Sequence, residues 1–211
     1  MAQAAQAMIA TRFGDIARTP KGRTTLQAIL EATFELATTQ GLLAASQEAI
    51  ARRTGLTQSA VRHYFPTKSD LLDAFFWYGS QKLEQQLVDE IGKTDIAPRT
   101  RLLSLADLHY ELILKVDDSA YFETLSIWAR TPKYRKYRDS FQRRVCGYYA
   151  DLLRVMHPEW DDKRCTATTF QLFTMVLGAW QSMGSSSVMQ PRLGRKALKA
   201  ILLEGIERLI E

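Results

Sequence analysis

Apolar side chains recur every three or four positions along most of this chain, a spacing that predicts α-helices and gives no sign of a strand. The helix predicted from the first such stripe ends at Gln40-Gly41, and glycine is frequent just past the end of a helix. The stripe consists of Leu26, Ile29, Leu30, Thr33, Phe34 and Ala37. These positions share one face of a helix, so we expect an amphipathic helix that buries this face.

Residues 46–65 predict two short helices joined by a tight turn. Ser46 and Thr57 can each cap the helix that follows, because their hydroxyls accept hydrogen bonds from free backbone amides of the first turn. Gly55 lies where the first helix must stop, since glycine adopts a positive φ at little cost. This arrangement is typical of a helix-turn-helix, whose second helix enters the major groove of DNA.

The second of these helices, expected over Gln58–Tyr64, carries mainly polar side chains. Val61 is placed to fill the space between the two helices. The polar positions are Gln58, Ser59, Arg62 and His63. A buried helix pair would not contain four polar residues there, which favours a DNA-reading surface. The alternative is an ordinary helix hairpin with a solvated outer face.

The run YFPTKSDLL at residues 64–72 resembles the stretch that joins the recognition helix to a long helix in the TetR family of bacterial transcriptional regulators. The three-helix order and the spacing of Ala51, Gly55 and Val61 also agree with that family, over about residues 22–75. The resemblance implies an all-α fold of about nine helices, with an N-terminal three-helix DNA-binding domain and a C-terminal helical ligand-binding and dimerisation domain.

We expect three parts in the chain: a flexible N-terminal arm at 1–20, the helix-turn-helix domain at 21–68, and the ligand-binding and dimerisation domain at 69–211. The helices of the last part are expected over 69–92, 98–116, 118–130, 132–156, 161–183 and 195–210. A segment rich in serine, Gly184–Leu193, is expected to be a flexible linker before the last helix.

The expected DNA contacts come from side-chain chemistry and from the resemblance. Gln58 can bind adenine through both atoms of its amide, and Arg62 and His63 can reach guanine N7 or phosphate. Tyr64 and Lys68 match family positions that contact phosphate. The full set is Ser46, Gln47, Thr57, Gln58, Ser59, Arg62, His63, Tyr64 and Lys68. The family commonly has Tyr where this chain has Arg62, which leaves the base preference there open.

Two apolar stripes near the C-terminus exceed what one small core needs. The resemblance implies that the last two helices of two subunits form a four-helix interface. Its expected residues are Phe170, Leu177, Trp180, Leu198, Ile201, Leu202 and Ile206. A homodimer also has a physical motive, because two half-sites about 34 Å apart specify DNA better than one. The alternative is that both stripes pack within one chain.

Aromatic residues gather between positions 109 and 180, where an apolar cavity between helices would hold a small-molecule effector. The candidate contacts are His109, Tyr121, Trp128, Tyr149 and Phe173. Aromatic residues at helical spacing are more often ordinary core, and this alternative stays open. The residues do not identify a ligand.

The formal net charge is +5, and segment 130–144 alone holds seven basic residues and one acid. With Tyr134 and Tyr137 between the charges, this segment can bind RNA or an anionic ligand. The alternative is a solvated helix start, with Pro132 in the first turn.

Composition excludes several classes of protein. No apolar run reaches the ~18–20 residues of a membrane helix, and the N-terminus lacks the pattern of a secretion signal. Cys146 and Cys165 lack metal-ligand spacing. We therefore expect a cytoplasmic protein without metal, cofactor or membrane contact.

The sequence contains no G-x-S-x-G, H-E-x-x-H or phosphate-binding loop, so we do not expect an enzyme. We expect a repressor that binds a palindromic operator as a homodimer and is released by a small-molecule effector. Three alternatives remain: a small-molecule binding protein with a vestigial DNA module, a transcriptional activator of the same fold, and a nucleic-acid protein that uses segment 130–144.

Overall fold

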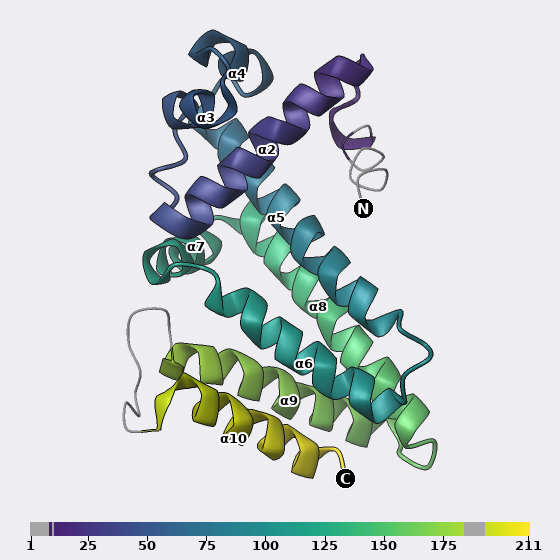
Figure 1. The fold of residues 1–211 in the computed structure, drawn as a ribbon. Helices are drawn as coiled ribbons and strands as arrows, with labels where there is room; N and C mark the ends of the chain where they lie inside the picture. Colours follow the sequence, from purple (N-terminus) through teal and green to yellow (C-terminus); the bar gives the residue numbers. More distant parts are fainter. Residues whose placement is uncertain (1–8, 10, 184–192) are drawn as a thin grey trace. The chain divides into compact units, whose positions relative to one another are not determined.

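The computed structural model describes residue 9 and residues 11–183 and 193–211 (Figure 1). In these residues the chain forms helices and no strand, which confirms the all-α prediction. The helices are α2 (Pro20–Gln40), α3 (Gln47–Thr54), α4 (Gln58–Tyr64), α5 (Lys68–Ile91), α6 (Pro98–Leu114), α7 (Asp118–Arg130), α8 (Pro132–Met156), α9 (Asp162–Met183) and α10 (Gly194–Leu209). Except for Leu193, the expected flexible linker lies outside the described residues.

The chain divides into two compact units, and the division differs from the expected one at residue 68. Unit 1 consists of Met1–Gly79 and Ser119–Ile127, and unit 2 of Ser80–Asp118 and Trp128–Glu211. The first half of α5 belongs to unit 1 because Leu71, Ala74 and Tyr78 are part of the hydrophobic core of that unit. The middle of α7 also joins unit 1, which the sequence did not indicate.

Helix α2 forms as the apolar stripe predicts. Thr19 caps it by accepting a hydrogen bond from the Gly22 amide at 3.0 Å, and Pro20 occupies the first turn. The helix stops at Gly41, whose φ of 92° is unfavourable for other residues. Its buried face contains every residue of the predicted stripe except Phe34, which is half-buried.

The loop after α2 is tied to α7 by one carboxylate. Glu123 Oε2 accepts a hydrogen bond from the Leu42 backbone amide at 2.6 Å. Gly41 lies beside the same carboxylate, and a Cβ added there would come within 3.4 Å of Glu123 Oε2. This bond explains why the middle of α7 belongs to unit 1: it satisfies a partly buried amide that the loop itself leaves without an acceptor.

The N-terminal segment departs from the expectation of a flexible arm at 1–20. Residues 1–8 and 10 lie outside the described residues, but Ile9 and Ala17 are buried in the core of unit 1. The ring of Phe13 packs against this core as well. The expectation was wrong for this part of the segment because three apolar side chains, spaced four residues apart, find partners on other helices.

Unit 2 is a helical bundle in which α6, α8 and α9 pack together and α10 lies beside α9 and α6 (Figure 1). Its core is apolar and includes Leu87, Leu102, Leu105, Tyr110, Val145, Tyr149, Leu153, Leu172, Val176, Leu202 and Ile206. Lys199 on α10 forms ion pairs with Asp107 and Glu111 on α6, at 2.6 and 2.7 Å. These pairs lie at the edge of the bundle and add to the packing that holds α10 in place.

Candidate nucleic-acid interface

Helices α3 and α4 form the predicted helix-turn-helix. Ser46 Oγ accepts a hydrogen bond from the Ala49 amide, and Thr57 Oγ1 accepts one from the Ala60 amide, each at 3.1 Å. Gly55 adopts the left-handed conformation, with φ 70° and ψ 16°. Both caps and the turn therefore form where the sequence analysis expected them.

The apolar side of α4 faces the rest of unit 1. Val61 is fully buried, together with Ile50 and Ala51 of α3 and with Phe65, the residue that follows α4. The polar side of α4 is exposed. It presents Gln58, Ser59, Arg62 and His63. The fold thus buries Val61, which was predicted to fill the space between the two helices. It leaves the four polar positions accessible to a ligand.

The basic residues of the helix-turn-helix fall into two groups. Arg52 is paired with Glu48, and Arg53 donates to both carboxylate oxygens of Glu35, at 2.8 and 3.0 Å. The hydrogen bond to Glu35 and the negative charge of that carboxylate raise the pKa of Arg53. The side chains of Arg62 and Lys68, in contrast, have no hydrogen bond or ion pair with any other described residue. These two exposed cations are available to bind an anion such as phosphate.

Two further predicted DNA contacts have partners inside unit 1. Gln47 Nε2 donates to the carbonyl oxygens of Phe65 at 2.8 Å and Pro66 at 3.2 Å. The half-buried Tyr64 donates its hydroxyl to the Gly22 carbonyl at 3.4 Å. Both bonds fix the C-terminal end of α4, a role that the sequence analysis missed because the acceptors are backbone carbonyls distant in the sequence.

Lys68 is the first residue of α5, and residues 65–67 connect it to the end of α4. Thr67 and Asp70 form a capping box: the Asp70 carboxylate accepts from the Thr67 amide at 2.9 Å, and Thr67 Oγ1 accepts from the Asp70 amide at 3.2 Å. This reciprocal cap fixes the backbone on which Lys68 is carried. The exposed ammonium group therefore follows α4 at a defined place.

Comparison with known proteins agrees with this geometry. Residues 29–75, which run from the middle of α2 into α5, match the model of bacterial regulatory proteins of the tetR family. Over these residues the chain is similar to the TetR family. The match contains the whole helix-turn-helix and the run that led the sequence analysis to the same family.

Two curated relatives to which this chain is similar are HTH-type transcriptional regulators. BetI of Yersinia pestis (strain Pestoides F) is 28% identical over 104 residues, which are 49% of this chain and 52% of the relative. PksA of Bacillus subtilis (strain 168) is 34% identical over 129 residues, which are 61% of this chain and 60% of the relative. The chain thus spans only about half to three fifths of the curated relatives it matches.

Solved structures share the fold over most of the chain. A TetR-family regulator from Mesorhizobium loti has a TM-score of 0.69 at 16% identity and covers 91% of this chain and 95% of its own. A transcriptional regulator from Saccharomonospora viridis, in complex with choline, has a TM-score of 0.65 at 18% identity and covers 87% of this chain and 94% of its own. All four proteins are described as regulators of transcription, and none as an enzyme.

Three of the five effector candidates come together in unit 2. His109 Nδ1 lies 3.2 Å from the Tyr149 hydroxyl, and the ring centroids of His109 and Phe173 are 5.7 Å apart. Burial lowers the pKa of His109 to about 4, so its ring is neutral at pH 7, and burial also raises the pKa of Tyr149. Tyr121 belongs to unit 1, and the half-buried Trp128 belongs to unit 2.

The predicted dimer residues divide between the surface and the core. Phe170 is 69% exposed and Ile201 49% exposed, whereas Leu202 and Ile206 are buried within the chain. Leu177 and Leu198 are half-buried, and the side chain of Trp180 lies outside the described residues. Phe170 and Ile201 are therefore accessible to a partner helix. Leu202 and Ile206 are not, because they already belong to the core of unit 2.

The basic segment 130–144 lies mostly in α8, and part of its charge is used inside unit 2. Arg135 donates to the carbonyl oxygens of Trp128 at 3.3 Å and Ala129 at 2.6 Å, which caps the end of α7. Arg144 Nη2 donates to Glu84 Oε2 at 2.7 Å, and this partner raises the pKa of Arg144. These contacts favour a structural role for both side chains over the binding of an external anion.

Neither a metal site nor a membrane helix emerges from the part of the chain that the structure describes. No group of three or more histidine, cysteine, aspartate or glutamate side chains could hold a metal ion there. No helix in that part is both long and apolar enough to cross a membrane.

The buried His109 makes a pH dependence testable. Its folded-state pKa of about 4 is below the ordinary value of 6.5, so the unfolded chain binds a proton that the folded chain does not. Stability should be full above about pH 6.5 and should fall by about 1 kcal/mol between pH 7 and pH 5.5, continuing down to about pH 4. Urea unfolding at several pH values measures this loss.

The control for this prediction is a pair of matched variants. His109→Gln, which keeps a polar group near Tyr149, should flatten the dependence over this pH range. His63→Gln changes an exposed histidine and should leave the slope as it is in the original protein. Equal slopes in the original protein and in the His109 variant would contradict the assignment.

Proposed function

We propose that this protein is a sequence-specific DNA-binding regulator of transcription that represses its target by binding a palindromic operator as a homodimer. The observation that carries this proposal is the exposed polar side of α4, which stands on a packed three-helix support. A short helix of this kind reads base edges in the major groove, and flanking cations contact phosphate.

Each exposed side chain has a separate task in this proposal. Arg62 reads guanine, because a guanidinium can donate to guanine O6 and N7 together, and Gln58 reads adenine through its amide. His63 and Ser59 supply shorter contacts to base edges or backbone. Lys68 neutralises a phosphate and adds affinity without sequence preference.

A homodimer would explain the apolar surface of the last two helices. Phe170 on α9 and Ile201 on α10 are large hydrophobic side chains exposed on adjacent helices of unit 2. A symmetric pairing of α9 and α10 would bury them and would bring two copies of α4 to one operator. The two-fold symmetry of the dimer then requires a palindromic operator, and reading two successive major grooves requires half-sites about 34 Å apart.

Release by an effector is proposed at the cluster of His109, Tyr149 and Phe173. The structural relative from Saccharomonospora viridis was solved with choline. Aromatic rings attract a quaternary ammonium through their negative faces, and a neutral histidine adds no repulsion. Choline is therefore the first ligand to test for this chain, and release requires that it bind the two states of the protein unequally.

DNA selection tests the central proposal. Purified protein should retain a palindromic sequence from random duplexes at moderate salt. Arg62→Ala should lower affinity for that operator by about tenfold or more and relax preference at one base pair per half-site, because one base contact is lost. Lys68→Ala should weaken operator and random DNA to a similar degree, because phosphate contacts carry no sequence information.

Arg52→Ala is the matched control, since this exposed arginine is paired with Glu48 in the same helix-turn-helix. Its operator preference should stay that of the original protein. Sequence selection that survives Arg62→Ala unchanged would refute the assignment of this side chain, and retention of no sequence at all would refute the proposed function.

The dimer has its own test. Phe170→Asp and Ile201→Asp together should convert the protein to a species with a mass near 24.0 kDa, because a charge at an apolar interface remains unpaired. Size-exclusion chromatography with light scattering measures the mass. Val155→Asp, at a residue of α8 that is 62% exposed, is the control and should leave the dimer intact. Loss of the dimer in both proteins, or in neither, would count against this interface.

Effector release is tested by titrating choline into the complex of protein and selected operator. We expect the affinity for DNA to fall by roughly 5–150-fold while the protein stays dimeric, as is usual for coupling between two sites. Phe173→Leu should reduce this response, because it removes an aromatic face and keeps an apolar side chain. Phe122→Leu, at an exposed residue of unit 1, should respond like the original protein. An affinity that no small organic cation alters would exclude this form of release.

A further inference from the structure

Helix α4 cannot hold its own direction. It has 7 residues, and a helix of that length is unstable in isolation. Its orientation must come from tertiary contacts, which are those of the buried Val61 in its middle and those at its two ends. Thr57 caps the N-terminal end, and Phe65 follows the C-terminal end as a buried residue.

Phe65 is held through its backbone and through its ring. Its amide donates to the Val61 carbonyl at 3.0 Å, and its carbonyl accepts from Gln47 Nε2 at 2.8 Å. Its ring meets the ring of Phe13 edge to face, with centroids 5.9 Å apart and planes at 86°. The ring contact therefore comes from the N-terminal segment, which the helix-turn-helix pattern does not include.

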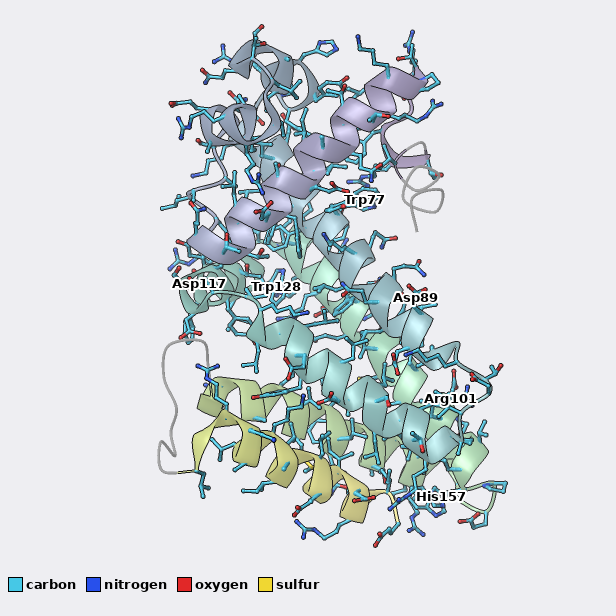
Figure 2. All side chains as sticks on the ribbon, viewed as in Figure 1. Trp77, Asp89, Arg101, Asp117, Trp128 and His157 are labelled. Atoms are coloured by element: carbon cyan, nitrogen blue, oxygen red, sulfur yellow. The ribbon has the colours of Figure 1, made fainter. Side chains whose placement is uncertain are left out.

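Phe13 also contacts α5. Its ring lies edge to face with Trp77, with centroids 5.1 Å apart and planes at 86° (Trp77 is labelled in Figure 2). The segment around it is fixed on both sides, because Ile9 and Ala17 are buried in the same core. The Phe13 carbonyl accepts hydrogen bonds from the amides of Ile16 at 3.0 Å and Ala17 at 2.9 Å, which closes a turn.

We propose that Phe13 is a positioning residue for sequence recognition: residues 11–17 insert the ring of Phe13 against Phe65 and Trp77 and thereby fix the angle of α4. This inference rests on the proposed function. A base-reading side chain works only when its support holds it within a fraction of an ångström of the right place. Loosening one end of a two-turn helix moves Arg62 more than it moves the rest of unit 1, so specific binding suffers first.

Comparison with another phenylalanine separates positioning from general stability. Phe34 on α2 packs in the same unit against Phe75 and Tyr78 of α5, with ring centroids 6.0 and 6.1 Å apart. Phe34→Ala therefore removes a ring of the same size from the same unit. The lost contacts are those between α2 and α5, and not those at the end of α4. It is the matched control for Phe13→Ala, and Phe13→Tyr is the conservative variant that should rescue.

The first measurement is amide hydrogen exchange without DNA. The readout is the exchange rate of the amides over residues 61–65, divided by that of the α2 amides in the same sample. Phe13→Ala should raise this ratio by about tenfold, because local opening of α4 becomes easier than opening of α2. Phe34→Ala should not raise the ratio, and Phe13→Tyr should return it to the original value. An unchanged ratio in Phe13→Ala would overturn the proposal.

The second measurement compares the selected operator with random duplex at one salt concentration. Phe13→Ala should lose about tenfold in operator affinity and stay within about twofold on random DNA, because Arg62 and Lys68 keep their charges. Equal losses on both DNAs, or no loss on the operator, would overturn the link to recognition. If the original protein selects no operator, the proposed function fails, and the exchange ratio still decides whether Phe13 positions α4.

Discussion

Helix α4 is two turns long, so the contacts that seat it on unit 1 decide what it can recognise. Val61 and Phe65 are buried on one side. At the N-terminal end the Ala60 amide donates to Thr57 Oγ1, and just past the C-terminal end Gln47 donates to the Phe65 carbonyl. With the apolar side covered, the polar side has nowhere to face except the solvent. The recognition surface is therefore a consequence of packing, since a helix of this length has little stability of its own.

The distribution of charge follows the same logic. The net charge of +5 alone does not identify a binding surface, because carboxylates and backbone carbonyls hold several arginines in place. Arg53 is bound by Glu35, Arg144 by Glu84, and Arg135 by carbonyls at the end of α7. The cations that remain without such partners around α4 are Arg62 and Lys68. A count of basic residues would have favoured segment 130–144, whereas the contacts favour α4.

Unit 2 has a neutral histidine in its interior and exposed apolar side chains on its last two helices. His109 is buried against Tyr149 and Phe173, and desolvation keeps its ring uncharged at pH 7. The same arrangement satisfies a core histidine, and it is the place where we propose that an effector binds. On the outside, Phe170 and Ile201 remain exposed although α9 and α10 each bury their other face. In our proposal, one bundle holds both the effector site and the dimer interface.

Features that depend on near neighbours in the chain follow from residue type and spacing. Caps at Ser46 and Thr57, the turn at Gly55 and the buried stripe of α2 all form where residue type and spacing predicted them. Tertiary structure alone decided the features that join distant segments, such as the bond from Leu42 to Glu123 and the docking of Phe13. Periodicity states which face of a helix is apolar, but the partner that covers the face is chosen by contacts far away in the chain.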